Sequence, residues 1–147
     1  MKLKGLLSIG VTDILGTGIS GIFWFFLAAL IDPENFGEIF YYIGIASLVS
    51  YISLIGTQDT IIVYVAKKIK IQSTLNVISL VIGGISLVVI VTIFDRIDVG
   101  FLLLAFVINT LAIGDLLGRN LYSSYSKYFL IQKILTLVLG FGFYYLF

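Results

Sequence analysis

A few polar and aromatic side chains inside otherwise apolar stretches are the residues of this chain that could carry out chemistry. They are Asp13, Trp24, Asn109, Asp115 and Arg119. A charged side chain at the centre of a bilayer costs about 2.5–3.5 kcal/mol on insertion scales, so such residues point toward protein or water and mark substrate or ion pathways. The chain has no cysteine and no histidine, which excludes thiol chemistry, histidine metal sites and histidine-based catalytic triads. We therefore expect binding and charge coupling rather than catalysis, with no cofactor and no metal.

Asp13 begins a polar stripe along one predicted helix. Thr17, Ser20 and Trp24 follow it at steps of three and four residues, and residues at this spacing share one face of an α-helix. The carboxylate either lines a cavity or couples to an ion there, or it hydrogen-bonds to another helix. We expect Trp24 to pack or to anchor the helix at the interface.

Asp115 and Arg119 lie four residues apart in the sequence, so on a helix they form an ion pair on one face. Arg119 either binds a ligand or stays with Asp115 and the lipid headgroups. Asn109, earlier in the same stretch, either lines a cavity or hydrogen-bonds to a neighbouring helix.

Composition indicates which elements position these residues. Of the 147 residues, 60% are hydrophobic and 12% are charged, whereas a soluble domain is about 45–50% apolar and about 25% charged. The net charge of +1 excludes the strongly basic surface of most nucleic-acid-binding proteins. The sequence thus predicts an all-α integral membrane protein that has the lipid bilayer, and no nucleic acid, as a partner.

About five apolar runs are long enough, at about 20 residues, to cross a hydrocarbon core of ~30 Å. Within a single transmembrane domain we place these spans at residues 6–30, 39–55, 75–94, 99–118 and 128–147, with an interfacial helix at about 58–71. Asp32 and Pro33 are a favourable start for the second helix, and the segment 119–127 is interpreted as a polar connection. Small residues let helix backbones approach closely in lipid. The expected packing residues are Gly16, Thr17, Ser20, Gly21, Gly83 and Gly84.

The loop charges predict an orientation. Lysine and arginine are retained on the cytoplasmic side of short loops, and the basic segments alternate here with the acidic segments 32–38 and 95–98. We expect a multi-pass protein of the cell membrane with a cytoplasmic N-terminus. Contact with lipid phosphate is a secondary role for the lysines near residue 68. The topology-setting residues are Lys2, Lys4, Lys67, Lys68, Lys70 and Lys127.

The order of several short motifs carries a family resemblance over essentially the whole chain. The elbow Ile31-Asp32-Pro33-Glu34-Asn35-Phe36-Gly37 is similar to an "L-x-P-E-x-[FY]-G" motif. A break at Leu54 and Gly56, the Ala66-Lys67-Lys68 segment, the stretch from Tyr122 to Tyr128 and the basic Lys133 follow in the same order. Together they resemble the N-terminal portion of polysaccharide and O-antigen flippases, the polysaccharide transporter family of the MOP exporter superfamily.

The resemblance implies a fold, an activity and partners. The fold would be a partial N-terminal lobe of a MOP-type (MATE-like) transporter, since members have two helical lobes and more spans than this chain. The activity would be translocation of a lipid-pyrophosphate-linked oligosaccharide by alternating access, for cell-surface polysaccharide biosynthesis. In that activity Arg119 would meet the substrate phosphate and Asp13 would couple transport to an ion, whereas packing stays the expected role of Trp24 over stacking on a sugar. The apolar run that reaches Phe147 fits this reading, in which the chain is a fragment and the remaining helices of the carrier, or a partner chain, complete it.

Two other classes stay open. One is a small helical membrane subunit or assembly factor without transport activity of its own. The other is a membrane-embedded lipid-phosphate enzyme, which would need carboxylates or basic residues clustered at one membrane face, whereas the acidic residues here are spread over both.

Overall fold

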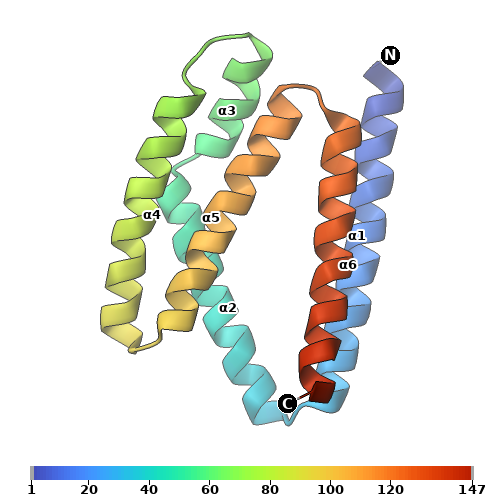
Figure 1. The fold of residues 1–147 in the computed structure, drawn as a ribbon, viewed down its shortest axis with the longest axis vertical. Helices are drawn as coiled ribbons and strands as arrows, with labels where there is room; N and C mark the ends of the chain where they lie inside the picture. Colours follow the sequence, from blue (N-terminus) through green and yellow to red (C-terminus); the bar gives the residue numbers. More distant parts are fainter. Residues whose placement is uncertain (1, 147) are drawn as a thin grey trace. The chain divides into compact units, whose positions relative to one another are not determined.

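The computed structural model describes the backbone of residues 2–146 and the side chains of residues 5 and 7–142. Every regular element in that part of the chain is an α-helix. The helices are α1 (Lys2–Leu30), α2 (Pro33–Leu54), α3 (Thr57–Ala66), α4 (Gln72–Phe94), α5 (Ile97–Gly118) and α6 (Tyr122–Leu146), as labelled in Figure 1. Their contacts form two compact units: unit 1 is Met1–Phe36 with Leu121–Phe147, and unit 2 is Gly37–Asn120.

Four helices in the described part of the chain are long and apolar enough to cross a membrane: Leu7–Leu30, Pro33–Leu54, Gln72–Phe94 and Ile97–Gly118. They lie at or near the first four predicted spans and indicate a multi-pass membrane protein. The fifth predicted span, 128–147, falls largely on α6, which is not among these four. Its last residue lies outside the described residues, so this span stays a prediction.

Two predicted helix boundaries are confirmed. Helix α2 begins at Pro33, and the carbonyl of Asp32 accepts the amide of Phe36 at 2.9 Å. The break after α2 consists of Ile55 and Gly56, both with left-handed φ angles of 46° and 71°. Only residues 95 and 96 join α4 to α5, so the helix of the fourth predicted span begins at Ile97, two residues earlier than expected.

The predicted polar connection from 119 to 127 is wrong. Helix α6 already begins at Tyr122, because left-handed Asn120, with φ 58°, ends α5 abruptly and the chain turns straight into the next helix. Serine and tyrosine cost little in a helix, and burial of Tyr125 offsets that cost. Polarity indicated a loop where packing maintains a helix.

The interfacial helix predicted over about 58–71 is also shorter than expected. Helix α3 ends at Ala66 in a Schellman turn, where the amide of Lys68 bonds to the carbonyl of Val65 at 2.9 Å and that of Ile69 to Tyr64 at 3.0 Å. Glycine normally occupies the left-handed position of this turn, but here Lys68 does, with φ 60°. The missing glycine is why the sequence indicated no helix end.

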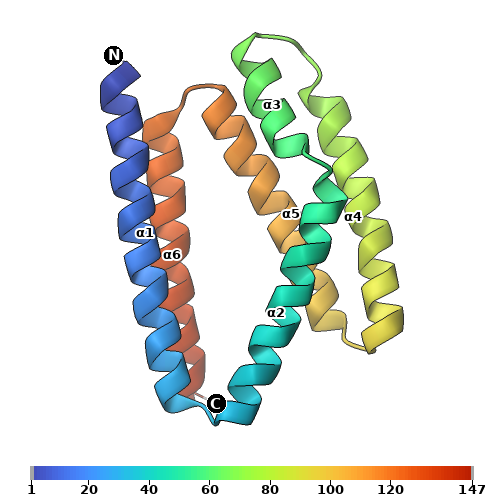
Figure 2. The same ribbon diagram turned by 180° about the vertical axis from the view of Figure 1, so that it is seen from behind.

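Unit 1 is a parallel pair of helices. Helices α1 and α6 lie side by side and run in the same direction (Figures 1 and 2). A glycine on one helix faces an aromatic ring on the other at three levels, so that an added Cβ would collide with the ring. These pairs are Gly5 with Tyr122, Gly16 with Phe129, and Gly140 with Phe23.

Unit 2 is built around α5, which packs against both α4 and α3. Its buried core includes Ile61 of α3 and Leu103 and Val107 of α5. Glycines of α5 make the close approaches: Gly100 meets Leu87 and Val91 of α4, and Gly118 meets the backbone of α3. Two hydroxyl pairs add hydrogen bonds between helices, and three of their four members, Ser53, Thr57 and Ser79, are buried. The pairs are Ser79 with Thr57 at 3.0 Å and Ser53 with Ser86 at 2.9 Å.

The predicted packing residues divide into two groups. Gly16 is buried against α6 and Ser20 is half-buried. A Cβ added at Gly83 would lie 3.5 Å from the side chains of Leu104 and Val107. Thr17 and Gly21 are exposed, and neither Gly21 nor Gly84 has a neighbour within 4 Å of an added Cβ. Of the six predicted packing residues, Gly16 and Gly83 therefore make close contacts among the described residues.

Candidate functional site

A tyrosine–aspartate pair joins the two helices of unit 1. The hydroxyl of Tyr125 on α6 donates a hydrogen bond to Oδ1 of Asp13 on α1 at 2.7 Å. Tyr125 is only 5% exposed, and Asp13 is half-buried. Near this pair along both helices, the hydroxyls of Ser8 and Ser126 lie 3.0 Å apart. Of the two roles expected for Asp13, the hydrogen bond to another helix is present, and ion coupling stays a prediction.

Gly16 of α1 positions this pair indirectly. Gly16 leaves room for the ring of Phe129, and that ring stacks on Tyr125 with centroids 5.7 Å apart. Tyr125 and Phe129 are four residues apart, hence on one face of α6. The arrangement leads from a small residue on α1, through two stacked rings on α6, back to the carboxylate on α1. It presents a buried phenol as the fixed donor to an ionisable group.

A second polar cluster lies at one end of unit 2. Nε of Arg119 lies 2.8 Å from Oδ1 of Asp115, which is the ion pair expected from their spacing. Nη2 of Arg119 also donates to Oε1 of Gln72 at 3.3 Å, linking the end of α5 to the start of α4. The guanidinium side chain is 53% exposed, so solvent or a headgroup can reach it.

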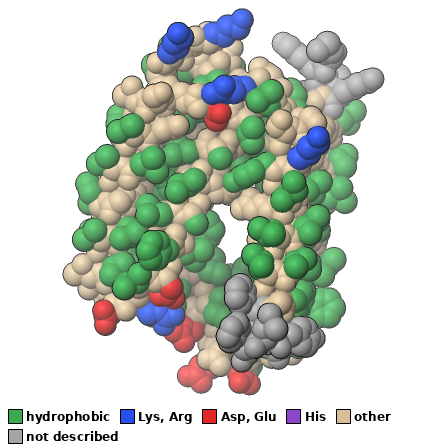
Figure 3. Space-filling view, viewed as in Figure 1, with side chains coloured by type: hydrophobic (Ala, Val, Ile, Leu, Met, Phe, Trp, Pro, Cys, Tyr) green, Lys and Arg blue, Asp and Glu red, His purple; other side chains and the backbone are tan. Residues whose placement is uncertain are grey.

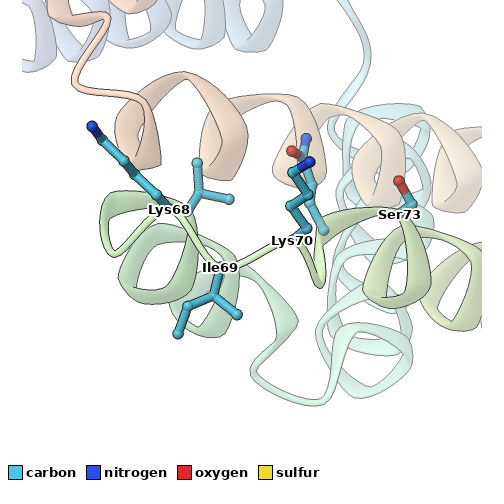
Figure 4. Close-up of a pocket in the computed structure, with 6 residues that line it drawn as sticks. Lys68, Ile69, Lys70 and Ser73 are labelled. Atoms are coloured by element: carbon cyan, nitrogen blue, oxygen red, sulfur yellow. The ribbon is translucent and has the colours of Figure 1, made fainter.

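Two cavities adjoin this cluster and share Gln72 in their linings. One, of about 280 Å³, lies at the α3–α4 connection and is lined by Lys68, Lys70, Gln72 and Ser73 together with Val65 and Ile69 (Figure 4). The other, of about 270 Å³, lies between α4 and α5 and includes Asn76 and Asp115. Positive charge therefore borders a cleft that leads between two apolar helices.

The opposite end of unit 2 is acidic. Arg96 lies between two carboxylates, 3.0 Å from Glu38 and 3.1 Å from Asp98, and 4.7 Å from the ring centre of Tyr42. The pKa of the Arg96 guanidinium is raised above its ordinary value, mainly by its hydrogen bond to Asp98 and next by the negative charge of that carboxylate. All three ionised side chains are well exposed, so these pairs contribute little stability.

The remaining predicted residues occupy separate places. Trp24 packs edge-to-face on Phe23 and Phe36, at 5.3 and 6.2 Å between ring centres, and Asn109 is half-buried on α5. In unit 2, Figure 3 shows Lys and Arg side chains near the α3–α4 connection and acidic side chains around the α4–α5 turn. The topology-setting residues Lys67, Lys68, Lys70 and Lys127 are exposed, whereas the side chains of Lys2 and Lys4 lie outside the described residues.

Sequence reasoning missed Tyr125, Gln72 and Asn76. Tyr125 was assigned to a loop, although its spacing to Phe129 was a usable helical signal. Gln72 and Asn76 are also four residues apart, which is a helical spacing, but uncharged polar residues give a weaker signal than the charged residues in the same region. Within the described residues, no group of three acidic side chains could hold a metal ion.

The comparisons with known proteins assign no family. No protein-family model, no curated protein and no solved structure matches this chain.

Proposed function

We propose that this chain is part of a membrane exporter that moves a lipid-linked oligosaccharide from the cytoplasmic to the outer leaflet by alternating access. The proposal rests on the motif order that resembles polysaccharide flippases. The observation that supports it best is the carboxylate of Asp13, hydrogen-bonded to Tyr125 between two long helices. An ionisable group at such a place is costly and is a functional-site hypothesis by default.

The Asp13–Tyr125 bond offers a physical means of coupling. An ionised carboxylate accepts the phenol hydrogen bond, and hydrogen bonds to ionised groups are stronger than neutral ones. Binding of a proton or a cation at Asp13 neutralises the acceptor and weakens its hold on α6. The ion would then bias the contact between α1 and α6, which is what a coupled carrier requires.

Arg119 is the proposed first contact for the substrate phosphate. Its guanidinium is exposed and already engages Asp115 and Gln72, and a planar fork binds phosphate oxygens in a bidentate manner. In this role Asp115 orients the guanidinium until the phosphate arrives.

The test is glycan export in a flippase-deficient strain that expresses the reading frame containing this chain. Asp13→Asn and Tyr125→Phe should each reduce export at normal membrane abundance. Arg119→Lys should keep partial activity and Arg119→Ala should lose most of it, because lysine retains the charge without the fork. Asp59→Asn, at an exposed carboxylate on α3, is the matched control. Normal export by both Asp13→Asn and Arg119→Ala would reject the proposed site.

The same proposal places the basic end of unit 2 in the cytoplasm. The chain contains no cysteine, so single cysteines can be introduced at the exposed positions Asn35, Lys70, Ile97 and Ser124. A membrane-impermeant thiol reagent applied to intact cells should label only the cysteines at positions 35 and 97. Labelling at position 70 or 124 would contradict the proposed orientation.

One observation favours a small membrane subunit as the second candidate. Gly10, Gly18 and Gly21 of α1 are exposed and have no neighbour within 4 Å of an added Cβ. Small residues are the usual contact surface between helices in lipid, so this face suits a partner helix. Efficient disulfide crosslinking of Gly21→Cys between two copies of the chain in membranes, with no export by any form of the reading frame, would favour this candidate.

A further inference from the structure

The cavity at the α3–α4 connection concentrates positive charge on one side of the chain. Lys68 and Lys70 extend to the same side of this connection, and Ile69 points to the opposite side (Figure 4). The hydroxyl of Ser73 and the amide of Gln72 complete the polar lining. Oε1 of Gln72 accepts from Arg119, and its N–H₂ group remains as a donor. Every polar side chain that lines this cavity can therefore donate a hydrogen bond.

The neighbouring cavity extends this site between two helices. Gln72, Asn76 and Leu80 are spaced four residues apart along α4 and all line it. Residues at this spacing form one stripe, and each step of four residues advances about 6 Å. On antiparallel α5, Asp115, Leu111 and Ile108 form the facing wall. Both walls change from polar to apolar in the same direction, away from the lysines.

Asn76 lies where the polarity changes. Its Oδ1 atom is buried and has no hydrogen-bond partner among the described residues. A buried amide atom without a partner is unfavourable and requires an explanation. Rotation of the amide would present its N–H₂ group to the same space, so Asn76 can serve either a donor or an acceptor.

We propose that these two cavities together bind one anionic phospholipid of the surrounding bilayer. The phosphate lies at Lys68 and Lys70, an ester carbonyl accepts from the Asn76 amide one turn deeper, and an acyl chain follows Leu80 and Ile108. The lysines select an anionic lipid over a zwitterionic one by charge. The apolar continuation of the site selects a lipid over free phosphate. The site is separate from the Asp13–Tyr125 pair, although its lining includes Gln72 and Asp115, the two partners of Arg119. It requires only that unit 2 lies in a bilayer.

The test is a titration of the purified chain, in neutral detergent, followed by native mass spectrometry. We expect phosphatidylglycerol to bind at least tenfold more tightly than phosphatidylcholine with the same acyl chains. Inorganic phosphate should not compete at the same concentration. Equal affinity for the two lipids, or competition by phosphate, would overturn the proposal.

Matched variants test each part of the site. Lys68→Asn combined with Lys70→Gln should abolish the preference for phosphatidylglycerol, since asparagine tolerates the left-handed backbone of position 68. Arginine at both positions should retain it, which separates loss of charge from misfolding. Ala112→Leu, which narrows the apolar cavity, should weaken the binding of both lipids. Lys67→Gln, at an exposed neighbour outside the lining, is the control, and a loss as large as in the double variant would contradict the site.

Discussion

Replacement of Gly118 by alanine should separate α3 from α5. An added Cβ would lie 2.9 Å from Cβ of Val65 and 3.2 Å from the carbonyl oxygen of Ile61. Carbon atoms are in optimal contact at about 3.5–4.0 Å, so α3 would have to move by more than about 0.5 Å. Overpacking of this kind costs about 1–3 kcal/mol, and the better helix propensity of alanine returns up to about 1 kcal/mol. The net destabilisation is therefore on the order of 1 to 2 kcal/mol.

Gly84 supplies the control because an alanine there meets nothing within 4 Å. Gly84→Ala should be neutral or slightly stabilising. The assay is alkylation of a cysteine introduced at Ser79, which is fully buried beside α3, in a chain without native cysteines. When opening is a rapid equilibrium, 1 to 2 kcal/mol corresponds to roughly 5–30-fold faster labelling. An unchanged rate in Gly118→Ala, or an equal acceleration in Gly84→Ala, would refute the close approach of α3 and α5.

Three further outcomes follow from the described contacts. Tyr125→Phe should lower the free energy of separating α1 from α6 by about 1–3 kcal/mol, because it leaves the half-buried carboxylate of Asp13 without its donor. Alkylation of a cysteine placed at buried Thr12 should then be faster, and an unaltered rate would count against this reasoning. Lys68→Gly should slow hydrogen exchange of the Ile69 amide, since glycine removes a left-handed strain of roughly 1 kcal/mol; faster exchange would disprove the assignment of strain. Arg96→Gln should change stability by less than about 1 kcal/mol, and about 1 M salt should abolish even that effect, because exposed ion pairs are weak and screened; a large effect that persists in salt would show that the pair is buried.

The sequence was most informative where hydrophobicity and helix-ending residues agree. The Asp32–Pro33 start of α2 and the break at Gly56 each combine an end of an apolar run with a residue suited to a helix terminus. The ion pair between Asp115 and Arg119 was predictable because it is local: both members lie on one turn of one helix. Local spacing settles such contacts without knowledge of the partner helix.

Contacts between distant segments could not be predicted in the same way. The Asp13–Tyr125 bond joins residues 112 positions apart, and only the pairing of α1 with α6 brings them together. Likewise, glycines at regular spacing indicate that a helix can be approached closely, but not on which face a partner lies. That is why Gly16 and Gly83 make contacts whereas Gly21 and Gly84 do not, and why Gly100 and Gly118 were overlooked.

The division of unit 1 between the two ends of the chain has a consequence for biosynthesis. Helix α1 emerges from the ribosome long before α6, since all of Gly37–Asn120 is translated between them. At roughly 5–20 residues per second, this interval lasts on the order of ten seconds. During it, Asp13 enters the membrane without the phenol of Tyr125, at an insertion cost of about 2.5–3.5 kcal/mol. The newly made α1 therefore needs the insertion machinery to shield its carboxylate until α6 is inserted beside it.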